Sequence, residues 1–176
     1  RFIKTGAFPV YLENVDMNLL ELPGEYPEIH RLCDKISNGK SGHALISGLL
    51  PIHRAHFAAY ILQKTARRAV IICPDDLQSK RMADDINTFA GAPLCSVLPS
   101  RDLLFHNVDV VSREWEQKRI CALHQFFTRK TRVLVMSVDA AFLRTLPPEV
   151  LHQAVFSLKL SGSYSLDDLT RRLLYA

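Results

Sequence analysis

Residues 47–55 resemble a phosphate-binding loop, because they lie between a strand-like run and a helix-like run and have Gly48 near their start. Such a loop has the pattern G-x-x-x-x-G-K-[ST], in which glycines let backbone N–H groups face a phosphate, the lysine pairs with it and the hydroxyl holds Mg²⁺. Gly48 keeps the first glycine of this pattern. His53, Arg54 and Ala55 replace the second glycine, the lysine and the hydroxyl.

Each departure from the pattern removes a part of the phosphate chemistry. Pro51 has no N–H to offer, and the side chain of His53 crowds the turn. Arg54 keeps a positive charge, but its planar guanidinium does not replace a compact ammonium, and Ala55 cannot ligate Mg²⁺. We therefore predict no nucleotide binding, no catalytic residue and no cofactor. Two interpretations stay open: an ordinary strand-to-helix turn, or a phosphate loop that has lost its chemistry.

The other residues with chemical potential have simpler explanations. Asp75 and Asp76 follow an apolar run, as a metal-binding acid would, but they also suit the start of a helix. His53 and His56 are three residues apart, which fits one helix face, yet no third ligand has matching spacing. We favour helix capping for the acids and predict no metal site. Motifs typical of hydrolases are absent from the sequence.

Two basic clusters, Arg67 with Arg68 and Arg129 with Lys130, each precede an apolar run. We interpret them as complements to the negative ends of helices, while a contact with nucleic-acid phosphates stays open. The net charge of +4 is weak support for nucleic acid, because the 22 basic and 18 acidic residues are interspersed.

Alternating apolar runs and helical patterns predict an α/β fold with a parallel sheet flanked by helices. The predicted strands are residues 43–46, 69–73, 94–98 and 132–136, with a half-exposed strand at 155–160. The predicted helices are residues 26–36, 52–63, 77–89, 112–127 and 140–143, with a last helix from 165 onward. We expect the strand at 69–73 to be buried on both faces, Asp139 to cap the helix at 140–143, and residues 103–111 to be a loop.

The composition fits one domain, or one domain and part of a second, in 176 residues of which 48% are hydrophobic. Four widely spaced cysteines predict reduced core thiols in a cytoplasmic protein: Cys33, Cys73, Cys95 and Cys121. No apolar run is long enough for a membrane span, so we predict no membrane partner. Residues 1–16 are either a leader or an edge strand, and the last helix has no stop signal, so we expect a longer protein.

Several motifs in order resemble the N-terminal UvrB-homology region of bacterial transcription-repair coupling factors (Mfd). These motifs are the loop at Gly48, then VIICPD at 70–75, LPSRD at 98–102, SRE at 112–114, VLVMSVDAA at 133–141 and LPP at 146–148. The resemblance covers about residues 17–176. That region is itself similar to the N-terminal part of the excision-repair protein UvrB, whose loop keeps its glycines, lysine and threonine.

The resemblance implies a RecA-like domain with a degenerate phosphate loop at 17–153, followed by the beginning of a second, UvrA-recruiting α/β domain at 154–176. Pro51, His53, Arg54 and Ala55 depart from UvrB as Mfd proteins do. The implied partners are UvrA and other domains of the full-length chain, with DNA and RNA polymerase bound by parts absent from these residues. The competing hypothesis is an ATP-dependent helicase-like domain of UvrB type with an atypical nucleotide site.

Overall fold

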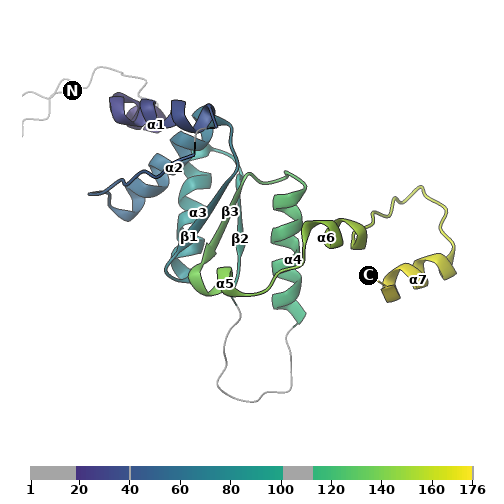
Figure 1. The fold of residues 1–176 in the computed structure, drawn as a ribbon. Helices are drawn as coiled ribbons and strands as arrows, with labels where there is room; N and C mark the ends of the chain where they lie inside the picture. The colour runs from purple at the N-terminus through teal and green to yellow at the C-terminus, as the bar shows by residue number, and fades with distance from the viewer. Residues whose placement is uncertain (1–18, 40, 101–112, 176) are drawn as a thin grey trace, which may run out of the picture.

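A three-stranded parallel sheet forms the centre of the protein (Figure 1). The computed structural model describes residues 19–39, 41–100 and 113–175. In these residues the sheet has the order β1-β3-β2, from β1 (Ala69–Cys73), β3 (Val133–Ser137) and β2 (Cys95–Leu98). The predicted α/β class is confirmed, and a parallel sheet flanked by helices is compatible with a RecA-like arrangement.

Helices cover the two faces of the sheet unequally. On one face α3 (Asp76–Ala90) packs on the strands, and α2 (Pro51–Thr65) packs on α3. On the other face α4 (Arg113–Phe127) covers β2 and β3. The strand β3 supplies Val133 and Val135 to the first core and Leu134 and Met136 to the second, as the alternation of side chains along a strand requires.

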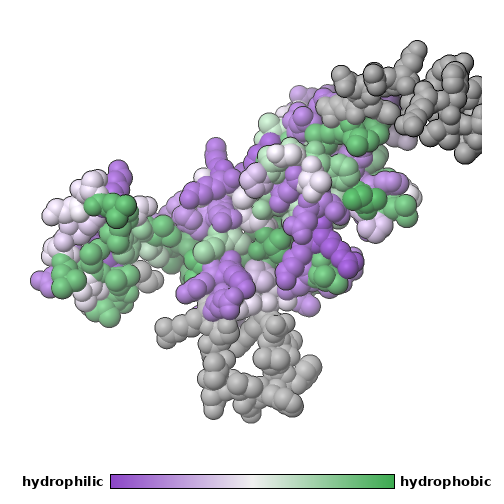
Figure 2. All heavy atoms as spheres, turned by 180° about the vertical axis from the view of Figure 1, so that it is seen from behind, coloured by the Kyte–Doolittle hydropathy of each residue, from purple (hydrophilic) through white to green (hydrophobic). Residues whose placement is uncertain are grey.

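Shorter elements complete the chain at both ends. Near the N-terminus, the 3-10 helix η1 (Leu19–Glu25) and α1 (Pro27–Ser37) pack against α2. After β3 come α5 (Val138–Phe142), α6 (Pro148–Ala154) and α7 (Leu166–Tyr175). Figure 1 shows α7 apart from the sheet, and Figure 2 shows apolar residues on its surface.

Local sequence signals explain several helix ends. The carboxylate of Asp75 accepts a hydrogen bond from the N–H of Gln78 at 2.7 Å, so the predicted capping role of the acids at the start of α3 is confirmed for Asp75. At the other end of α3, Gly91 is left-handed with φ +62°. The cap of α5 is Ser137 rather than the expected Asp139, which lies in the first turn of that helix.

Two predicted strands do not form, and the predicted burial of a third strand was wrong. Residues 43–46 and 155–160 are not strands, and Leu45 is 92% exposed. Neither segment pairs with another strand, and a short apolar run without a paired neighbour gains no ladder of hydrogen bonds. The strand β1 forms as predicted but is not buried on both faces, because it lies at the edge of the sheet.

Other differences concern single residues and short segments. Cys121, expected in the core, is exposed on α4, whereas Cys33 and Cys73 are buried. The helix α6 was not predicted; it begins at Pro148, a residue that suits the first turn of a helix. The predictions for residues 1–16 and 103–111 lie outside the described residues.

Candidate functional site

The segment before α2, residues 41–50, forms neither a helix nor a strand. Residues 43–46, just before the loop at Gly48, do not form a strand, and residues 41–48 are exposed. Gly48 is left-handed with φ +79°, a conformation that favours glycine, and Leu50 precedes the helix without a side-chain cap. Pro51 is the first helical residue, where its missing N–H costs nothing. The glycine and the proline therefore have structural explanations in the turn itself.

The two residues that align with the lysine and the hydroxyl of a phosphate loop are used for packing and for the turn. Arg54 donates from Nε to the carbonyl oxygen of Leu49 at 3.3 Å, and its N–H donates to the carbonyl of Leu50 at 3.0 Å. Ala55 is 0% exposed and belongs to the core that α2 and α3 share. The side chain at this position lies in the core. His53, where the second glycine would stand, is exposed.

A pocket of about 290 Å³ opens beside this loop. Its walls are mostly apolar, and Arg54 is its one charged lining residue. The lining comes from the loop and from one side of α2: Ile46, Ser47, Gly48, Leu49, Arg54, Phe57, Ala58 and Ile61. A phosphate site needs converging N–H groups and a cation, whereas this pocket presents mainly hydrocarbon.

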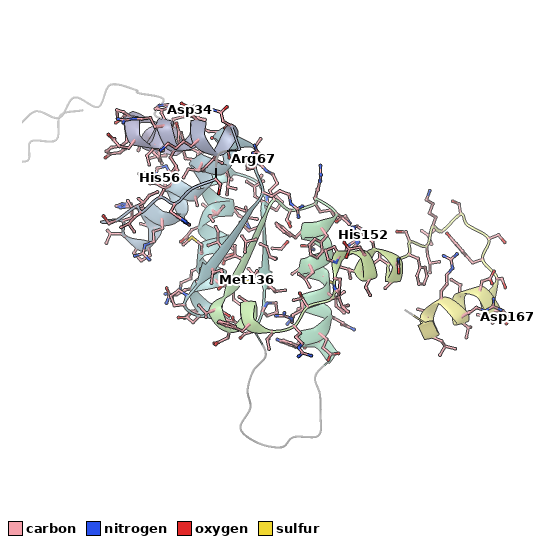
Figure 3. All side chains as sticks on the ribbon, viewed as in Figure 1. Asp34, His56, Arg67, Met136, His152 and Asp167 are labelled. Carbon is pink, nitrogen blue, oxygen red and sulfur yellow. The ribbon has the colours of Figure 1, made fainter. Side chains whose placement is uncertain are left out.

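His56 holds the N-terminal segment against α2. Its Nε2 lies 2.5 Å from the carbonyl oxygen of Leu19, and its ring stacks on Phe89 with centroids 4.6 Å apart. Figure 3 labels His56 on α2. No cluster of three metal-ligating side chains occurs within residues 19–39, 41–100 and 113–175.

Arginines before the strands hold the C-terminal ends of three helices. Arg67 donates to the carbonyl of Ser37 in α1 at 2.9 Å, and Figure 3 shows Arg67 near the end of that helix. Arg68 donates to the carbonyl of Phe126 in α4 at 2.5 Å, and its guanidinium also lies over the aromatic ring of Phe126. Arg132 donates to the carbonyl of Leu62 in α2 at 2.6 Å.

These contacts agree with the interpretation of Arg67 and Arg68 as complements to helix ends. In the second cluster, Arg129 and Lys130 are exposed, and Arg129 is left-handed with φ +61°. All four residues lie just before strands, so the structure brings the two predicted clusters to the amino-terminal edge of one parallel sheet. Arg67 and Arg68 are partly committed to carbonyl oxygens, which leaves fewer donors for phosphates.

A polar cluster at the carboxyl-terminal edge of the sheet was missed. Asp76, in the first turn of α3, accepts hydrogen bonds at Oδ2 from the N–H and the hydroxyl of Ser100 at 2.9 and 2.8 Å. Burial alone would raise the pKa of Asp76, but the hydroxyl of Ser137 and both donors of Ser100 outweigh it, so the pKa lies below its usual range. The acid pair after the strand is a signal in the sequence, but the helix cap accounts only for Asp75.

Two side chains of α4 hold the end of β2 from the other face. Trp115 donates from its ring nitrogen to the carbonyl of Ser100, and Arg119 donates from Nη1 to the carbonyl of Pro99 at 2.7 Å. Arg119 is only 5% exposed, and burial lowers its pKa while Asp76 opposes that effect. Among the described residues, the cluster contains a carboxylate, two hydroxyls and a guanidinium, and no histidine or thiolate that could activate a nucleophile. It fixes the strand end.

Comparisons with known proteins add no relative. No family model, no curated protein and no solved structure matches this chain. What the fold defines is an α/β protein with a parallel sheet flanked by helices. In the part of the chain that the structure describes, no helix combines the length and the apolar character needed to span a membrane.

Proposed function

We propose that this chain is the non-catalytic N-terminal module of a transcription-repair coupling factor. In this role it helps to link stalled RNA polymerase to nucleotide excision repair, through UvrA recruitment and restraint of the motor, in the cytoplasm. The order of motifs in the sequence suggests the family, and the local structure of the loop at Gly48 supports the absence of catalysis.

The observation that carries the non-catalytic part of the proposal is the position of Ala55. A Mg²⁺-binding hydroxyl has to face the phosphates, but this side chain is fully buried between helices. A serine or threonine at this position would lie in the core and would have to leave it before its hydroxyl could reach a metal. Arg54, the one cation of the loop, already donates to a carbonyl of the same loop.

The competing proposal is a helicase-like domain that binds ATP through this unusual loop. Titration of the whole 176-residue chain with fluorescent ATP and Mg²⁺ distinguishes the two proposals. Our proposal expects no saturable binding and no phosphate release. Binding with a Kd of about 10 µM, or turnover of ATP, would support the helicase-like domain instead.

The predicted nucleic-acid contact at Arg67, Arg68, Arg129 and Lys130 is a separate question. Binding through phosphates weakens steeply as salt rises, with a slope set by the number of contacts. We expect at most weak binding to duplex DNA at low salt, because two of these arginines already hold helix ends. Tight binding that Arg129→Gln and Lys130→Gln together abolish would establish a DNA-binding module.

A further inference from the structure

The turn after α1 contains an asparagine followed by a glycine. Asn38 is the only asparagine of the sequence that precedes a glycine. It is the C-cap of α1, with φ −75° and ψ 2°, and Gly39 is left-handed with φ +66°. Both residues are exposed, so water reaches the side-chain amide of Asn38 and the peptide group that follows it.

An asparagine side chain can react with the backbone nitrogen of the next residue. The nitrogen of Gly39 attacks the side-chain carbonyl carbon, Cγ, of Asn38, and the new C–N bond closes a succinimide ring. The old C–N bond of the side-chain amide breaks, and its nitrogen leaves as ammonia with the proton that Gly39 gives up. Water then opens the ring at either carbonyl, which leaves aspartate or isoaspartate at position 38. Glycine favours this reaction because it has no Cβ to hinder its nitrogen.

Two backbone hydrogen bonds hold the reacting residues in the turn. The N–H of Asn38 donates to the carbonyl of Asp34 at 3.0 Å, and the N–H of Gly39 donates to the carbonyl of Ile36 at 3.1 Å. Attack on Cγ requires the second bond to open, because the nitrogen of Gly39 must turn toward the side chain. Helix ends open at little cost in free energy, since few buried contacts hold them. The folded turn therefore slows the reaction without preventing it.

Asn87, within α3, is an asparagine that the fold protects. Its Oδ1 accepts hydrogen bonds from the N–H groups of Leu94 and Cys95, at 2.8 and 3.0 Å. The next residue is Thr88, whose branched side chain hinders the backbone nitrogen. Both the fixed side chain and the hindered nitrogen disfavour ring closure at Asn87, so this residue is an internal reference for Asn38.

We propose that Asn38 is a site of spontaneous deamidation in the folded protein, through the backbone nitrogen of Gly39. The reaction places a carboxylate at the C-terminal end of α1, where the negative end of the helix disfavours it. Isoaspartate also adds a methylene to the backbone, which displaces Gly39 from the carbonyl of Ile36. The product therefore weakens the last turn of α1, a helix that packs against α2. This site is independent of the loop at Gly48 and of nucleotide binding.

Mass spectrometry of the whole folded chain, incubated at neutral pH and then digested with trypsin, tests the site. The peptide of residues 36–40 should gain the mass difference between an amide and an acid, and it should separate into aspartate and isoaspartate forms. The same chain unfolded in urea gives the unrestrained rate. We expect conversion in the folded chain to be slower by a factor of about 2 to 10, as one backbone hydrogen bond would cause. The peptide that contains Asn87 should stay unconverted in the folded chain.

Two variants at the exposed position 38 serve as controls. Asn38→Gln keeps the amide but moves it one methylene further from the backbone, so ring closure is disfavoured and the conversion should be lost. Asn38→Asp carries the charge of the product and marks where the converted chain elutes in ion-exchange chromatography. A folded chain that stays unconverted while the chain in urea converts most of its Asn38 would overturn the proposal. Equal conversion of Asn87 in the folded chain would also overturn it, because the fold would then not select the site.

Discussion

Asp76 on α3 binds Ser100 at the end of β2 through two hydrogen bonds, from the backbone N–H and from the hydroxyl, to the same carboxylate oxygen. The two residues are 24 positions apart and belong to different elements. Because Ser100 is also held by Trp115 through its carbonyl, the end of β2 is fixed from both faces of the sheet. This contact links the first turn of α3 to the strand that follows it.

The contact predicts an acid-sensitive part of the stability. The folded protein lowers the pKa of Asp76, so its contribution is present above the unfolded pKa of about 4 and is lost as the pH falls through the lower folded value. We expect Asp76→Asn to lower the free energy of unfolding at pH 7 and to flatten its fall below about pH 4. Urea unfolding between acidic and neutral pH measures both effects. Asp34→Asn, on an exposed position of α1, is the control; an equal flattening there would contradict the assignment.

A second prediction concerns the arginine that joins α2 to the sheet. Arg132 donates from Nη2 to the carbonyls of Leu62 and Arg67, at 2.6 and 3.1 Å. Arg132→Met keeps most of the apolar stem and removes both bonds, so we expect a loss of about 1–3 kcal/mol in the free energy of unfolding. Lys130→Met, two residues earlier and exposed, should change it by less than about 0.5 kcal/mol. Equal effects in chemical denaturation would exclude a specific role for Arg132.

A third prediction uses the backbone at the end of α2. Ala66 is the C-cap in the left-handed region, with φ +51°, where a side chain is strained and glycine is not. Ala66→Gly should therefore raise the free energy of unfolding by up to about 1 kcal/mol. In the matched change Ala90→Gly, at the last residue of α3, glycine should lower the free energy of unfolding by up to about 1 kcal/mol. Thermal unfolding of both variants gives the signs, and destabilisation at both positions would refute the strain at Ala66.

The cysteines should differ in reactivity. Burial raises the pKa of Cys95 to about 12 and also raises that of Cys33 and Cys73, whereas Cys121 is exposed on α4. Since the thiolate is the reactive form, we expect iodoacetamide at pH 8 to label Cys121 first in the folded protein. Peptide mapping by mass spectrometry identifies the labelled residue. Early labelling of Cys95 would contradict its burial, and equal labelling in urea is the control.

Periodicity predicted the helices well, because their stop and start residues act locally. The proline at the start of α2, the acid that caps α3 and the glycine after α3 each fix a helix end without help from distant residues. The strands depended on neighbours that the sequence does not identify. Residues 43–46 and 69–73 are both apolar, but only the second run found a partner strand, so only it formed a strand.

The candidate site was predictable only where it depends on local residue types. Replacement of the lysine and the hydroxyl in the loop at Gly48 is visible in the residue types alone. The burial of Ala55 and the bond from Arg54 to Leu49 depend on how α2 packs, which the pattern does not specify. The cluster around Asp76 joins α3, the end of β2 and α4, so no local sequence motif could indicate it.

The most direct test of the central claim is a titration of the whole chain with Mg²⁺ and a fluorescent ATP analogue, followed by equilibrium dialysis with labelled ATP. The account predicts no saturable binding up to about 1 mM, because the position that would hold the metal carries the buried Ala55, and Arg54 donates from its Nε to a carbonyl of the same loop. Saturable binding in the micromolar range that Arg54→Ala abolishes would contradict it.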